Sequence, residues 1–210
     1  MPTNFELIRE VGTALGRLGA GYASSGARDK HYGVWLFAMV MDAAPPSTVL
    51  LYGIDFSGDA VFRGKPSDLD VPPRYTFGVI EGLRRRWEVH VDLNVVGASG
   101  ASHGVDVAVL PETNLERARR LGGSLAASGL ALGMEAKCFN IPLTPNEGRV
   151  ALGFHADLDG AFWLAANSDN QAVRDMLSMP GRKTALFAPL LPASVEEARF
   201  RAAAKAHLKR

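Results

Sequence analysis

The chain has 210 residues, of which 47% are hydrophobic, and its formal net charge is +1 at pH 7. This length and composition are enough for a substantial core, most simply one domain with an extension. A net charge close to zero excludes a globally basic nucleic-acid-binding protein, so any nucleic-acid surface must be a local patch. The single cysteine, Cys138, excludes an internal disulfide framework and a multi-cysteine zinc site.

The chain opens on a polar stretch rather than on a basic segment followed by an apolar one, so no secretory signal is predicted. The longest apolar run, residues 34–41, is too short to cross a bilayer. We therefore expect a soluble, cytoplasmic protein with no membrane partner.

Residues 1–74 are predicted to form a helical and hairpin extension packed on the core. In chain order we expect a helix over 5–18, a Gly- and Ser-rich connection over 19–28, a buried helix over 29–44, a hairpin formed by 49–56 and 60–63, and a proline-rich linker over 65–74. For residues 29–44, which are apolar on most faces, a strand is the alternative to the helix.

Residues 75–210 are predicted to form the core. The expected helices cover 77–87, 111–127, 146–158, 170–179 and 194–209, and the expected strands cover 88–96, 105–110, 130–139, 161–166 and 184–189. Because helices and strands alternate, the fold class is α/β, with a mixed central sheet flanked by helices.

The strand over 88–96 alternates between apolar and polar residues. One face is predicted to carry Val89, Val91, Leu93 and Val95, and the other to carry Glu88, His90, Asp92 and Asn94. The polar face is expected to meet either solvent or a functional site.

Two later strands carry charge where a buried strand should be apolar. Asp106 lies within an apolar strand, and Glu135 and Lys137 lie two residues apart on the next one. A buried ionised group is costly unless it is paired, hydrogen-bonded or bound to a metal. Glu135 and Lys137 share a face because the side-chain period of a strand is two. Together with the carbonyl oxygen of Ala136, the carboxylates are suited to Mg²⁺ or Mn²⁺ beside a phosphodiester, and Lys137 is placed to position water.

The order of these features resembles the PD-(D/E)XK nuclease superfamily, which has a restriction-endonuclease-like fold. The resemblance rests on the Gly-rich turn 97–104 leading to Asp106, followed by Glu135-Ala136-Lys137, and it covers roughly residues 75–189. It implies metal-dependent cleavage of nucleic acid, with Asp106 and Glu135 as metal ligands and Lys137 as the catalytic lysine. Glu81, on the expected helix 77–87, matches an acid that many members carry there, and Glu88 is its competitor.

Four further residues are candidates for contact with nucleic acid: His103, Arg149, Arg84 and Arg85. His103 lies in the turn before Asp106 and could bond a phosphate or carry a proton. The three arginines could contact the phosphate backbone. Each also has a simpler interpretation as a solvated side chain or a surface ion pair.

The sequence thus predicts a Mg²⁺-dependent nuclease acting on DNA rather than RNA, with a role in restriction, phage defence or DNA repair. Because cutting a duplex takes two sites, a homodimer is one expected assembly, and a larger complex with partner proteins is another. Two alternatives stay open. One is a non-catalytic scaffold or assembly subunit with a nuclease fold, and the other is a small-molecule phosphodiesterase or cyclic-nucleotide effector.

Overall fold

The computed structural model describes residues 28–44, 49–52, 62–70, 73–81, 85–123, 125–138 and 141–209. The expected helix over 5–18 lies outside the described residues, as does most of the connection that follows it. None of the described helices has the length and apolar character needed to cross a bilayer.

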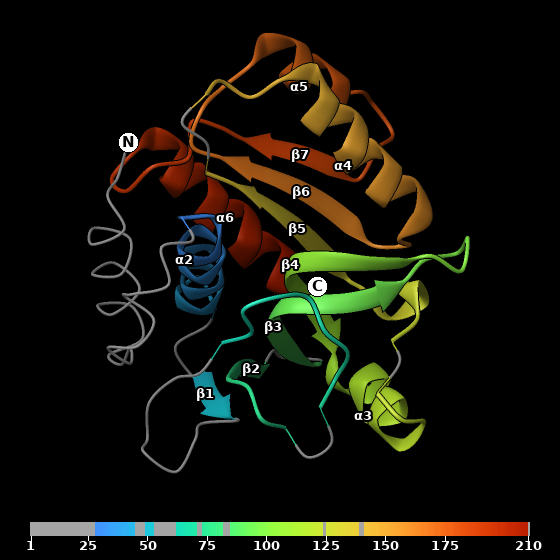
Figure 1. Ribbon diagram of the computed structural model, residues 1–210. Helices are drawn as coiled ribbons and strands as arrows, with labels where there is room; N and C mark the ends of the chain where they lie inside the picture. The colour runs from blue at the N-terminus through green and yellow to red at the C-terminus, as the bar shows by residue number, and fades with distance from the viewer. Residues whose placement is uncertain are drawn as a thin grey trace.

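The described residues form a seven-stranded sheet in which the strands stand in chain order (Figure 1). Its strands are β1 (Val49–Tyr52), β2 (Phe77–Glu81), β3 (Arg86–Val96), β4 (Ser102–Pro111), β5 (Leu132–Lys137), β6 (Ala161–Ala166) and β7 (Thr184–Phe187). Neighbours from β1 to β5 are antiparallel, whereas β5, β6 and β7 are parallel. The predicted α/β class with a mixed central sheet is confirmed.

Helices cover both faces of this sheet. They are α2 (Arg28–Asp42), α3 (Glu112–Arg120), α4 (Pro145–Asp157), α5 (Gln171–Leu177) and α6 (Val195–Leu208), with a 3₁₀ turn at Ala127–Gly129. Side chains of α2 and α6 pack in one apolar cluster with one face of the sheet, and those of α3, α4 and α5 pack in a second cluster with the other face (Figure 1). The helices α4 and α5 are the crossovers that parallel strands require.

The helix α2 confirms the buried helix expected over 29–44. Its side chains from Tyr32 to Met41 are almost fully buried, and it packs on β3, β4 and β5. The Tyr32 hydroxyl donates a hydrogen bond of 2.8 Å to the carbonyl of Leu190, beside α6. With β1 as an edge strand of the same sheet, the described part of the chain before residue 75 shares the core of the rest.

The helix predicted over 77–87 is wrong, because this stretch forms β2 and the start of β3. Four of the five β2 residues are buried, so the strand has no polar face and lacks the period of two that marks a half-buried strand. Gly78 lets α2 approach β2, since a Cβ there would lie 2.1 Å from Sδ of Met41.

Two other expectations need correction. The strand at 49–52 pairs with β2, with Val49 opposite Ile80, rather than with residues 60–63. Residues 53–61 lie outside the described part of the chain, and residues 62 and 63 are not in a strand. The helix expected over 111–127 ends at Arg120, because Gly122 and Gly123 have φ of +95° and +89°, which suits glycine.

The polar and apolar faces predicted for the strand 88–96 are correct only up to Val91. Val89 and Val91 pack in the cluster with α2, whereas Leu93 and Val95 pack in the cluster with α3, α4 and α5. Between them, Asp92 is buried with φ of +51°. On β4, Val107 packs in the cluster with α2 and Val105 in the other cluster. The apolar side chains of β3 and β4 therefore change from one face of the sheet to the other at the same level, at Asp92 and Asp106.

Glu88 and His90 do not face solvent; they form a buried polar network under α3. The Glu88 carboxylate accepts two hydrogen bonds from the Arg119 guanidinium, of 2.8 and 2.6 Å, and lies 2.9 Å from Nε2 of His90. The Phe77 ring stacks on His90 with centroids 5.0 Å apart and also lies under the Arg119 guanidinium. This network joins α3 to β3.

Replacing Arg119 with alanine should destabilise the protein by about 3 kcal/mol, because it leaves Glu88 buried without its bidentate partner. Urea unfolding followed by circular dichroism measures the change. Arg120→Ala is the matched control, since the Arg120 side chain is exposed and bonds only the Glu116 carbonyl among the described residues. An equal loss in both variants would contradict the role of the network.

The same network makes stability depend on pH. Burial lowers the pKa of His90, and this outweighs the hydrogen bond to Glu88, which raises it. Burial acts to raise the pKa of Glu88, but hydrogen bonds from His90 and Arg119 lower it overall. Glu88 is therefore ionised and His90 neutral in the folded protein.

Because its folded-state pKa lies below the value of about 6.5 in an unfolded chain, protonation of His90 favours unfolding. The wild type should lose free energy of unfolding as the pH falls through about 6.5, and His90→Gln should lose less, since glutamine can donate to Glu88 but does not titrate. Urea unfolding at pH values between about 7.5 and 5.5 measures the slopes, in a window above the acid range in which Glu88 titrates. Identical slopes would show that His90 is not responsible.

Candidate active site

Asp106 and the Glu135-Ala136-Lys137 segment meet where β4 and β5 separate. The ladder between the two strands runs from Val109 opposite Leu132 to Val107 opposite Met134 and stops there. One step further along, a carboxylate oxygen of Asp106 accepts a hydrogen bond of 2.8 Å from the backbone N–H of Ala136. A side chain thus replaces a backbone acceptor at the point where the strands diverge.

The direction of this hydrogen bond also places the Ala136 carbonyl. In a strand, the N–H and C=O of one residue point to the same side. Since the N–H of Ala136 points to Asp106, its carbonyl points into the same gap between β4 and β5. The Lys137 carbonyl points the other way and accepts from the N–H of Asn167, which follows β6, at 3.1 Å.

Glu135 and Lys137 share the face of the sheet that α4 covers, as predicted. Met134 and Ala136 pack in the cluster with α2, on the opposite face of the sheet. Because side chains alternate along a strand, Glu135 and Lys137 lie on the α4 side. The Lys137 ammonium is ion-paired with the Glu135 carboxylate, and their side chains are 24% and 12% exposed. The pair is therefore close to the surface but largely shielded from water.

The first turn of α4 lies near this pair. Thr144 and Glu147 form a capping box that begins the helix. Burial acts to raise the pKa of Glu147, but hydrogen bonds from Thr144 and the backbone, together with the charge of Lys137, lower it overall. Lys137 thus lies within electrostatic reach of Glu147 as well as Glu135.

Asp92 is a neighbour that the sequence pattern did not single out. It stands level with Asp106 between the pairs Val91–Val107 and Leu93–Val105, and Glu135 follows one residue beyond the last pair of β4 with β5. Its charge acts on the buried guanidinium of Arg63, which also lies 3.4 Å from Asp70. In the sequence Asp92 falls in step with the polar face of this strand, so no local signal separates it from Glu88, His90 and Asn94.

The oxygen donors of Asp106, Glu135 and Ala136 are of the type that magnesium-like cations prefer. Two carboxylates and a backbone carbonyl supply oxygen ligands, and Mg²⁺ commonly keeps several waters in addition. Among the described residues, no group of three or more His, Cys, Asp or Glu side chains is placed to hold a metal ion. The predicted ligands are two carboxylates and one carbonyl, those of Asp106, Glu135 and Ala136, which is fewer side chains than such a group contains.

Glu81 does not join this set. It lies at the exposed end of β2, on a strand rather than a helix, and pairs with Arg86 at 3.5 Å. Trp87, next to Arg86, stands opposite Pro111, five residues along β4 from Asp106, which is about 16 Å. Glu88, the alternative to Glu81, is bonded by Arg119 and stands opposite Leu110, four residues along β4 from Asp106.

The four predicted nucleic-acid contacts lie in different places. His103 is 2.5 Å from the Asp157 carboxylate, and its ring packs edge-on against Phe154, so it fastens β4 to the end of α4. Hydrogen bonds from His103 and Ser99 lower the pKa of Asp157. Arg149 is exposed on α4.

Arg85 is exposed at the start of β3 and borders a 420 Å³ cleft with Glu112 and Asn114, at the end of the sheet away from Asp106. Arg84 lies outside the described residues. The structure joins Asp106 to Ala136 by a hydrogen bond and Glu135 to Lys137 by an ion pair, on adjacent strands, and it does not bring Glu81 or Arg85 to them.

Comparison of the chain with protein-family models, with curated proteins and with solved structures finds no match. The chemistry of the site is therefore argued from its own residues.

The effect of the hydrogen bond that Asp106 accepts can be measured separately from the effect of its negative charge. Asp106→Ala leaves the Ala136 N–H without its acceptor and should cost about 1–3 kcal/mol, whereas Asp106→Asn keeps a carbonyl oxygen there and should cost less than about 1 kcal/mol. Urea unfolding measures both, and amide hydrogen exchange at Ala136 reports the bond directly. Equal losses in the two variants would mean that this bond does not hold β5 to β4.

Proposed function

We propose that the protein is a Mg²⁺- or Mn²⁺-dependent nuclease that hydrolyses phosphodiester bonds, in DNA rather than RNA, from a site formed by Asp106, Glu135, Ala136 and Lys137. The observation that carries the proposal is the hydrogen bond from Ala136 to Asp106. It places an acid from one strand beside the Glu-x-Lys segment of the next, although 28 residues separate Asp106 from Glu135 in the sequence.

The division of roles follows from the donors. Asp106, Glu135 and the Ala136 carbonyl would hold the cation, which when bound supplies charge stabilisation at the phosphoryl oxygens and an acidified water. Lys137, on the same face as Glu135, would orient the attacking water and balance the negative charge that develops on the phosphoryl group. Its ion pair with Glu135 positions the ammonium on this face, and its charge also acts on Glu147.

Strand order gives further support to the resemblance. The chain runs through β3, then the strand with Asp106, then the strand with Glu135 and Lys137, and β6 follows in parallel after α4. This is the order in which the nuclease superfamily places its motif residues. The scaffold alternative drew on an N-terminal segment that the core did not need, and the burial of α2 against the sheet removes that reason for it. We also propose that the protein acts in the cytoplasm, in restriction, phage defence or DNA repair.

Cleavage of double-stranded DNA, single-stranded DNA and RNA should be assayed with Mg²⁺ and Mn²⁺. We expect DNA cleavage that Asp106→Asn, Glu135→Gln and Lys137→Met each reduce by about 100-fold or more, because each removes a group acting at the reacting phosphate. Glu81→Gln is the matched control, since it neutralises an acid outside the site, and it should keep wild-type activity.

Isothermal titration of Mn²⁺ tests the cation site separately from cleavage. Binding should be lost in Asp106→Asn and Glu135→Gln and kept in Lys137→Met. If the folded wild type binds no cation and cuts none of the substrates, the nuclease proposal is wrong and the scaffold interpretation is favoured. Activity that survives all three substitutions would place the chemistry elsewhere.

A further inference from the structure

A groove runs along the edge of the sheet where the parallel strands begin. It consists of two adjoining cavities of about 540 and 670 Å³, and Asp159 and Lys183 line both. Cavities of this size are typical of small-molecule sites. The groove lies at the Leu132 end of β5 and Lys137 is at its other end, about 16 Å along the strand, so the groove is well separated from the candidate active site.

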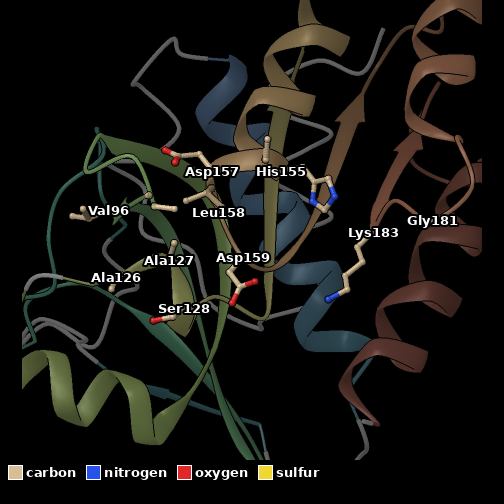
Figure 2. Close-up of a pocket in the computed structure, with 13 residues that line it drawn as sticks. Val96, Ala126, Ala127, Ser128, His155, Asp157, Leu158, Asp159, Gly181 and Lys183 are labelled. Carbon is tan, nitrogen blue, oxygen red and sulfur yellow. The ribbon is translucent and has the colours of Figure 1, made fainter.

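The first half of the groove carries polar groups that point inward (Figure 2). Asp159, before β6, and Lys183, before β7, direct their side chains into the cavity from different sides, with His155 of α4 and Ser128 nearby. No ion pair joins Asp159 to Lys183, although both are among the described residues, so each is available to a ligand. The loops that carry them are short, and Gly160 and Gly181 allow their turns, Gly181 with φ of +83°.

The second half has an apolar floor and a cationic rim. Leu130 and Trp163 line it together with a set of small side chains: Ala131, Ala161, Ala203 and Ala206. His207 of α6 packs edge-on against Trp163 with ring centroids 5.9 Å apart. Arg182 and Lys183 stand at the rim, where both are exposed.

These two halves favour a ligand with a flat ring system and an anionic group. An apolar floor of short side chains accepts a ring. Arg182 and Lys183, which are consecutive in the chain, supply positive charge for a phosphate, and Nη1 of Arg182 also donates a hydrogen bond of 3.0 Å to the Met176 carbonyl. A carboxylate and a hydroxyl in the adjoining cavity accept hydrogen bonds from hydroxyl or amino groups. We infer that the groove is a binding site for a nucleoside monophosphate unit, either as a free nucleotide or as the end of a single strand. The phosphate lies at Arg182 and Lys183, the base lies on the alanine floor, and Asp159 bonds the sugar. This inference does not depend on the nuclease proposal.

Titration of the full-length protein with adenosine monophosphate, followed by tryptophan emission, tests the site. All three tryptophans are buried, but Trp163 lines the groove and Trp35 and Trp87 do not, so a bound base should alter the Trp163 emission. We expect saturable binding that the double variant Arg182→Ala/Lys183→Ala weakens by about 10-fold or more. Ala206→Glu, which places a carboxylate in the exposed part of the floor, should abolish it. Lys205→Ala is the matched control, because Lys205 neighbours Ala206 on α6 but does not line the groove.

Adenosine without its phosphate should bind at least about 10-fold more weakly than the monophosphate, and inorganic phosphate should compete. A short single-stranded oligonucleotide with a terminal phosphate distinguishes the two sources: tighter binding than the free nucleotide identifies a strand end, and weaker binding identifies a free nucleotide. If neither ligand binds saturably at up to about 5 mM, or if Lys205→Ala weakens binding as much as the double variant, the inference is wrong. Equal binding of adenosine and its monophosphate would also overturn it. Circular dichroism of each variant confirms that it is folded.

Discussion

Carboxylates on the central strands each require a donor within hydrogen-bond reach, because an ionised group in the interior of a sheet is otherwise too costly. Glu88 receives the Arg119 guanidinium and His90, Glu135 receives Lys137, and Asp106 receives the backbone N–H of Ala136. The Glu88 network joins a helix to the sheet, and the Asp106 bond joins two strands. The arrangement of α3, β4 and β5 thus depends on these acids as well as on apolar burial.

The Asp106 bond has a geometric consequence. Because a side chain takes the Ala136 N–H, β4 and β5 need not stay paired beyond Val107 and Met134, and a gap opens between them. The face exchange at Asp92 and Asp106 places a further acid level with Asp106 and turns the far halves of β3 and β4 toward α4. In the proposed nuclease, this gap is where the carboxylates and the Ala136 carbonyl would hold the cation.

The parallel strands β5, β6 and β7 have functional candidates at both of their ends. The Glu135–Lys137 pair lies near the carboxyl end of β5, which is where open α/β sheets generally bind their ligands. The groove with Asp159 and Lys183 lies at the amino ends, where the loops before β6 and β7 are short and α6 presents small side chains. Separate variants can therefore test the two sites, because they share no residue.

The sequence by itself determined the α/β class, every strand from β3 to β7 and the shared face of Glu135 and Lys137, and it favoured a helix over a strand for the buried α2. The spacing of apolar residues, the turn residues and the charges within apolar runs are local properties of the sequence, and these features can therefore be predicted from them. Only the tertiary structure decided that residues 77–81 form a strand, because burial on both faces removes the period that identifies one. It also decided that Glu81 lies at the far end of the sheet and that Asp106 reaches Ala136. Register between strands depends on packing across the whole sheet, and no local pattern specifies which acid stands beside which backbone group.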